Sequence, residues 1–266
     1  MGHRTELPPA SRVEVTSRCE IPGAADYARI KIGELSRLTH RPVLQACVKL
    51  TRHPDPAVSR PVVAQAMLDV DGRLVRAQVE GSTAREAIDR LQAKMRRQLE
   101  RIDRGHARRR EHAVAEMRDA SRPRLTEHRP GHVTRPPGER RIVRRKSFAM
   151  APCTIDEAVD EMDLLDYDFH LFTEMHSSAA GVVYRSGPTG LRVTMVAPAL
   201  ADQLGPITNP VTFSPQPTPC LTEEAAIDRI ELLGLPFLFY IDAAQGRASL
   251  LYRRVDGHFG VIAPAG

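Results

Sequence analysis

The chain has 266 residues with 38 Lys and Arg against 33 Asp and Glu, so its formal net charge is +5, and its 42% apolar fraction is enough for a core. Its cysteines, Cys19, Cys47, Cys153 and Cys220, stand far apart without a C-x-x-C pair. This argues against a zinc module and a disulfide framework and favours a reducing cytoplasm. No segment approaches the roughly 18 apolar residues of a membrane span and no apolar stretch marks a signal peptide, so we expect a soluble, cytoplasmic protein with no membrane partner.

Charge and aromatic residues are unevenly distributed along the chain. Most of the positive excess precedes residue 147, whereas the segment that begins TIDEAVDEMDLLDYD is acidic. Tyr27 is the only aromatic residue before residue 145. We therefore expect two cores of different composition, with a polyanion-binding front half and a back half that does not bind polyanions. The alternative is a basic surface that is solvated and has no ligand.

The front of the chain predicts a strand, a helix and three further strands. Val13 and Val15 alternate with polar residues in a strand over residues 11–19, and apolar residues at helical spacing follow over residues 22–38, with Lys31 on the polar side. Strands are predicted at VLQACVKLTR, PVVAQAMLDV and LVRAQVE. The dipeptide Asp71-Gly72 between the last two is a strong hairpin signal.

A second helix is predicted after these strands. Thr83 and Glu86 are spaced as a capping box, which satisfies free backbone donors where a helix begins. An apolar stripe and a cationic stripe follow at helical spacing, and they lie more than about 90° apart around the helix. We expect the apolar stripe to pack on the sheet and the cationic stripe to face solvent. The apolar stripe is Ile88, Leu91, Met95, Leu99 and Ile102, and the cation row is Arg90, Lys94, Arg97 and Arg101.

Residues 106–145 are predicted to be a mobile, basic linker, because they are rich in Arg and Pro and contain few large apolar residues. His128 and His132 are four residues apart in this segment. Pro130 and Gly131 stand between them and forbid a helix that would present both to a metal ion. We expect no metal site there.

The rest of the chain contains one small unit twice, over residues 146–200 and 211–266. Each copy has a helix with Thr154 or Thr222 as N-cap, an aromatic strand (FHLF or FLFY), a turn and a second strand (GVVYR or SLLYR). Equivalent positions lie 68 residues apart, as for Phe169 and Phe237. A unit of about 50 residues buries little surface alone and needs a partner.

No catalytic motif is present in the sequence. It lacks a P-loop, an H-E-x-x-H, a G-x-S-x-G and any evident arrangement of nucleophile and base. Asp156, Asp160 and Asp163 are expected to form the solvated face of a helix rather than a metal site. We therefore expect no enzyme activity, no cofactor and no metal.

Four segments carry a resemblance to the ribosome hibernation promoting factors. DGRLVRAQVEGSTAREAIDRLQAKMRRQLER resembles the last strand and second helix of their N-terminal domain, and RVEVTSRCEIPGAADYARIKIGELSRL resembles its first strand and helix, with Lys31 at a basic family position. RRKSFAMAPCTIDEAVDEMDLLDYDFHLF and LLYRRVDGHFGVIAP are similar to the C-terminal domain of the long form. The fold expected is α+β. It has a β-α-β-β-β-α domain (1–105), the linker, and tandem small α/β repeats that form a pseudo-dimer.

The resemblance implies a ribosome-binding inhibitor of translation. The family's N-terminal domain occupies the channel for mRNA and tRNA on the small ribosomal subunit. Lys31 and the cation row are therefore expected to contact rRNA, with the small subunit and the assembled ribosome as partners. A duplicated C-terminal domain resembles actinobacterial members linked to hypoxia or dormancy. The alternative function is a DNA- or RNA-binding stress regulator, although no helix-turn-helix or zinc signature supports it.

In ordinary long forms one C-terminal domain pairs with its twin on another ribosome and so joins two ribosomes. Here a short tether gives the second copy an effective concentration of about millimolar or higher. We expect the copies to pair within one chain, which leaves a monomer that stabilises single idle ribosomes; the rival is domain-swapped pairing between two chains. The residues expected in this contact are Phe169, Phe172 and Tyr184 in the first copy and Phe237, Phe239 and Tyr252 in the second.

Overall fold

The computed structural model describes residues 13–17, 22–39, 41–53, 58–108, 135–148, 150–186, 190–199, 204–254 and 256–264. The chain forms two compact units. Unit 1 comprises Met1–Arg118 together with Leu164–Asp166, and unit 2 comprises Asp119–Asp163 and Tyr167–Gly266.

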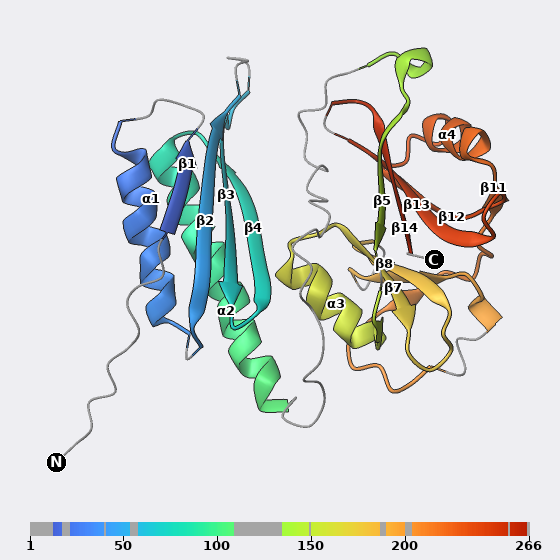
Figure 1. The fold of residues 1–266 in the computed structure, drawn as a ribbon, viewed down its shortest axis with the longest axis horizontal. Helices are drawn as coiled ribbons and strands as arrows, with labels where there is room; N and C mark the ends of the chain where they lie inside the picture. The colour runs from blue at the N-terminus through green and yellow to red at the C-terminus, as the bar shows by residue number, and fades with distance from the viewer. Residues whose placement is uncertain are drawn as a thin grey trace. The chain divides into compact units, whose positions relative to one another are not determined.

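Unit 1 follows the order β-α-β-β-β-α that the sequence predicts. Its elements are β1 (Val13–Ser17), α1 (Ala24–Gly33) with a 3₁₀ turn at Glu34–Arg37, β2 (Val43–Arg52), β3 (Val62–Val70), β4 (Arg73–Gly81) and α2 (Ala84–Arg108). The sheet order is β1-β2-β3-β4, with β1 parallel to β2 and the other pairs antiparallel. Both helices cover the same face of this sheet (Figure 1).

Local sequence signals explain two junctions in unit 1. Asp71 and Gly72 have φ values of 54° and 82°, the pair of positive values that a tight two-residue hairpin requires. At the start of α2, Thr83 Oγ1 accepts a hydrogen bond from the Glu86 N–H at 3.2 Å. The Glu86 carboxylate accepts from the Ser82 N–H at 2.8 Å, one residue earlier than a standard capping box has it.

Unit 2 contains two five-stranded sheets of matching design. The elements around the first repeat are β5 (Ile142–Phe148), β6 (Pro152–Cys153), α3 (Ile155–Leu164), β7 (Phe169–Glu174), β8 (Ala180–Tyr184) and β9 (Arg192–Met195). Those around the second are β10 (Thr212–Phe213), β11 (Cys220–Leu221), α4 (Glu223–Leu232), β12 (Phe237–Asp242), β13 (Arg247–Arg253) and β14 (Phe259–Pro264). A short 3₁₀ turn, Pro137–Glu139, precedes β5.

The two repeats exchange strands. The sheet orders are β10-β9-β8-β7-β6 and β11-β12-β13-β14-β5. The strand β5, which precedes the first repeat, therefore pairs in parallel with β14 of the second, beside which it lies in Figure 1. The strand β10, which precedes the second repeat, pairs in parallel with β9 of the first. Each leading strand thus completes the sheet of the other repeat.

This exchange changes one predicted boundary. Residues 142–145 belong to β5, although the sequence assigned them to the linker. They form a strand because β14 offers them a parallel partner far away in the sequence. Most of the predicted linker, including His128 and His132, lies outside the described residues.

Candidate nucleic-acid interface

The cation row of α2, defined above as Arg90, Lys94, Arg97 and Arg101, does not face solvent uniformly. The side chains of Arg97 and Arg101 are exposed. That of Arg90 is 41% exposed and that of Lys94 only 23%. The row therefore has an outer part, Arg97 and Arg101, and an inner part, Arg90 and Lys94, whose side chains contact the sheet.

Arg90 and Lys94 cover β4, which is the edge strand of this sheet among the described residues. Residues four apart on a helix are separated by about 6 Å along its axis, and residues two apart on a strand by nearly the same distance. Polar side chains of α2 at every fourth residue therefore match alternate carbonyl groups of β4 and satisfy them. The contacts are Arg90 Nη1 to Glu80 O at 3.1 Å, Lys94 Nζ to Gln78 O at 3.3 Å and Gln98 Nε2 to Arg76 O at 2.9 Å.

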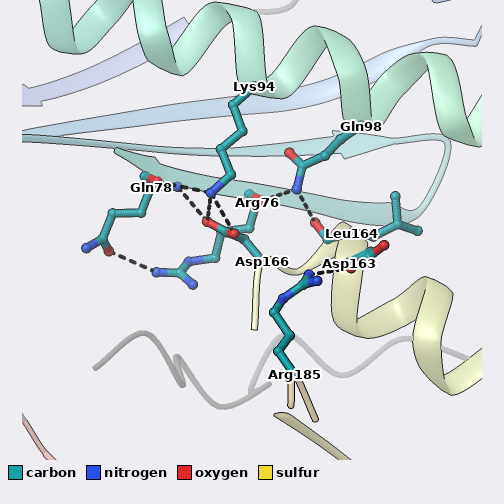
Figure 2. Close-up of polar contacts among 8 residues, drawn as sticks. All are labelled: Arg76, Gln78, Lys94, Gln98, Asp163, Leu164, Asp166 and Arg185. Atoms are coloured by element: carbon teal, nitrogen blue, oxygen red, sulfur yellow. Dashed lines mark hydrogen bonds and ion pairs between the residues drawn. The ribbon is translucent and has the colours of Figure 1, made fainter. Parts of the chain in front are cut away.

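Two members of the row also meet carboxylates within unit 1. Arg90 Nη2 lies 2.6 Å from Glu86, one helical turn earlier. Lys94 Nζ lies 2.7 Å from the carboxylate of Asp166, as Figure 2 shows. Part of the row's positive charge is thus neutralised inside the protein, which the sequence did not indicate because Asp166 is 72 residues from Lys94.

Lys31 lies in a second group of cations, between α1 and α2. Its Nζ is 3.5 Å from the Asp89 carboxylate and 5.6 Å from the centre of the Tyr27 ring. Arg85 Cζ lies 5.0 Å from the same ring, and the Tyr27 hydroxyl donates to Asp89 at 2.7 Å. Tyr27, followed by Asp89 and Glu34, raises the pKa of Lys31, which is a cation at neutral pH. Tyr27 and Arg85 were not among the predicted site residues.

In unit 2, aromatic rings of the two repeats meet. The ring centres of Phe169 and Phe237 are 4.8 Å apart, those of Phe169 and Tyr252 are 6.2 Å apart, and those of Tyr184 and Phe237 are 5.2 Å apart. These separations suit tilted and edge-to-face pairs. Phe239 lies on the same side of β12 as Phe237, because side chains alternate along a strand, and it is buried.

Phe172 corrects the predicted set of contact residues. It is three residues after Phe169 on β7, so its side chain points to the opposite face of the strand. There it is buried against Gly181, which pairs with it on β8 and leaves room for its ring. Phe172 therefore belongs to the core of its own repeat.

The acidic face of α3 also differs from the prediction. Asp156 accepts hydrogen bonds from the backbone N–H groups of Thr208 and Asn209 at 2.8 and 2.9 Å, which connects the helix to the segment between the repeats. Asp163 pairs with Arg185 (Figure 2). These carboxylates thus have structural partners, and no group of residues that could hold a metal ion occurs in the described parts of the chain.

Among the described residues, Cys47, Cys153 and Cys220 form no disulfide. None of the described helices combines the length and apolar character that crossing a membrane requires.

The chain is similar to several known proteins. Residues 137–193 and 214–261, one stretch in each repeat, match the family "Sigma 54 modulation/S30EA ribosomal protein C terminus". A protein of Mycobacterium tuberculosis, "Dormancy associated translation inhibitor", is 42% identical over 150 residues, which are 54% of this chain and 55% of that protein. A "Ribosome hibernation promotion factor" of Deinococcus radiodurans is 27% identical over 173 residues, 60% of this chain and 84% of that protein.

One solved structure similar to part of the chain is the N-terminal domain of Thermus thermophilus Protein Y. It is 27% identical, covers 35% of this chain and 99% of that one, and gives a TM-score of 0.29. The chain spans about half the length of the mycobacterial relative that it matches. The chain is thus similar to a translation inhibitor and to a ribosome hibernation promotion factor, and both of its repeats match the same C-terminal family.

Proposed function

We propose that this protein is a cytoplasmic ribosome hibernation factor, which binds the small ribosomal subunit in the channel for mRNA and tRNA and inhibits translation. Unit 1 binds rRNA phosphates through Lys31 and the outer part of the cation row. The names of the relatives, a translation inhibitor and a hibernation promotion factor, support this proposal.

The observation that carries the proposal is the exposed pair Arg97 and Arg101 on a helix whose other face is firmly packed. Ile88, Leu91 and Met95 of α2 are completely buried against the sheet. The helix therefore presents its arginines in a fixed row, and each phosphate contact they make releases counterions. Recognition of this kind depends on the shape and backbone of RNA rather than on base sequence.

We also propose that the protein acts as a monomer on single ribosomes. The ring contacts between the repeats and the exchange of β5 and β10 support this, because they use the pairing surfaces of both copies within one chain. An ordinary long form keeps such a surface for a second molecule. In the described part of this chain, the corresponding surfaces of the two repeats are already paired with each other.

Charge reversal of the outer part of the cation row tests the binding surface. Arg90 and Lys94 are left intact, because they also cover β4. The double variant Arg97→Glu/Arg101→Glu is expected to lose co-sedimentation with small ribosomal subunits and to lose inhibition of translation in a cell-free system, while its thermal unfolding stays unchanged.

The matched control carries the same charge change in unit 2, at the exposed residues Arg229 and Arg247. The variant Arg229→Glu/Arg247→Glu is expected to bind and inhibit like the original protein. Equal binding by both double variants and the original would show that α2 is not the interface. Equal loss in both would show that only total charge matters.

A further inference from the structure

Two donors of unit 1 converge on one carboxylate beside the cation row. The backbone N–H of Gln78 donates to Asp166 Oδ2 at 3.0 Å, and Lys94 Nζ lies 2.7 Å from both oxygen atoms of the same carboxylate. Figure 2 shows Lys94 and Gln78 meeting at this carboxylate. A backbone N–H held in a strand and an ammonium group together form a binding site for an oxyanion.

The segment that supplies this carboxylate is fixed to the same surface. Gln98 Nε2 lies 3.4 Å from the carbonyl oxygen of Leu164. The Leu164 side chain is 8% exposed and belongs to the apolar core of unit 1. Asp166 is thus held in place by a neighbouring apolar contact and is not a mobile surface charge.

The second repeat shows that its fold does not need this carboxylate. The residue 68 positions after Asp166 is Gly234, and both have the left-handed backbone, with φ values of 53° and 62°. Glycine adopts that conformation without the steric conflict that a side chain causes. Leu232, the counterpart of Leu164, is 85% exposed. The first repeat therefore keeps a less favourable residue at this turn, where its carboxylate contacts Gln78 and Lys94.

From this geometry we infer that Gln78 N–H and Lys94 Nζ form a phosphate site for RNA, which Asp166 occupies when RNA is absent. A phosphate oxygen makes the same two contacts as the carboxylate oxygen that it replaces. Binding of RNA at this site therefore requires Asp166 to leave. This site rests on the proposed function, because it requires that RNA binds unit 1 along α2.

Occupation by Asp166 has a direct consequence for affinity. An RNA phosphate that uses this site must displace the Asp166 carboxylate. The protein therefore binds RNA less tightly than it would if Lys94 had no carboxylate beside it. Removal of the carboxylate should strengthen binding by a factor set by one partly buried ion pair, about threefold to tenfold.

The test measures binding of a fluorescein-labelled single-stranded RNA oligonucleotide to the full chain by fluorescence anisotropy. Asp166→Asn is expected to bind about threefold to tenfold more tightly than the original protein. Asp166→Gly, which copies the residue of the second repeat, keeps the turn and is expected to do the same. The matched control is Asp163→Asn, which removes an equal charge from the ion pair with Arg185 in unit 2 and is expected to change binding less than about twofold.

Repeating Asp166→Asn in a Lys94→Met variant separates the release of Lys94 from the general effect of removing a negative charge. There Asp166→Asn is expected to bring no gain, because the carboxylate acts through Lys94. A gain that persists in this background, or an equal gain from Asp163→Asn, would overturn the inference. The small-subunit experiment above decides the proposed function separately, since the oligonucleotide measurement gives its answer whether or not ribosomes are bound.

Discussion

Glu174 and Asp242 occupy equivalent positions, at the ends of β7 and β12, and both are buried. Glu174 accepts hydrogen bonds from the backbone N–H groups of His176 and Ser177 at 3.0 and 2.7 Å. Asp242 accepts from the Ala244 N–H at 2.9 Å. In each repeat an acidic residue therefore holds the turn between the two central strands.

Glu174→Gln is expected to lower the free energy of unfolding at pH 7 by about 2 kcal/mol, because a buried charged acceptor is lost. Burial alone would raise the pKa of Glu174, but hydrogen bonds from Ser177 and His176 outweigh it and hold the pKa below its usual value. A carboxyl group with a lowered pKa contributes stability above its unfolded pKa, about 4.3, and loses it as the pH falls through the folded value.

Urea unfolding of both proteins checks this prediction. The difference in free energy of unfolding between the original protein and Glu174→Gln should reach its full value above about pH 5 and should shrink toward pH 3. Glu224→Gln, at an exposed position of α4, is the control and should show little difference at either pH. A difference for Glu174→Gln that does not change with pH would contradict the assignment.

The edge strand β4 is the feature that organises unit 1 at the scale of elements. Arg90, Lys94 and Gln98 satisfy its alternate carbonyl groups, so α2 both packs on the sheet and closes its open edge. Exposed edges of this kind are sites of unwanted strand pairing. Arg90, Lys94 and Gln98 of this helix therefore stabilise the sheet, whereas Arg97 and Arg101 are proposed to bind RNA.

Gln98→Met is expected to destabilise the protein by about 1–2 kcal/mol, because it leaves the Arg76 carbonyl oxygen without its donor while nearly preserving side-chain volume. Arg96→Met, at an exposed position of the same helix, is the control. Thermal unfolding followed by circular dichroism distinguishes them. Equal midpoints for the two variants would show that Gln98 does not support the edge.

Short-range signals in the sequence were sufficient to predict most elements. The Asp71-Gly72 hairpin and the N-caps Thr154 and Thr222 depend on residues within a few positions of one another. The structure has these features, with hydrogen bonds to Thr154 Oγ1 from the Glu157 N–H and to Thr222 Oγ1 from the Ala225 N–H.

Long-range pairing was not predictable from the same signals. The partner of β5 lies more than a hundred residues later, and a strand's sequence does not specify which distant edge it joins. The contact between Asp166 and Lys94 was equally unpredictable, because helical spacing indicates the cation row but not a carboxylate 72 residues away. The position of Phe172 could have been predicted, because two aromatic residues three apart on a strand point to opposite faces.

At the scale of the molecule, the exchange of β5 and β10 joins the repeats by more than their tether. A protease site inserted among residues 200–203 and then cleaved should leave the two fragments bound to each other, because each contains a strand of the other's sheet. Size-exclusion chromatography should show one species under native conditions and two in denaturant. Separate elution of the fragments without denaturant would contradict the exchange.

As proposed, this chain binds idle ribosomes through unit 1 while its two repeats pair with each other. Sucrose-gradient sedimentation of purified ribosomes mixed with the protein tests both parts of this proposal. The protein is expected in the monosome peak, with no increase in disomes as its concentration rises. A disome peak that contains the protein would contradict the pairing within one chain, and a protein that stays at the top of the gradient would contradict ribosome binding.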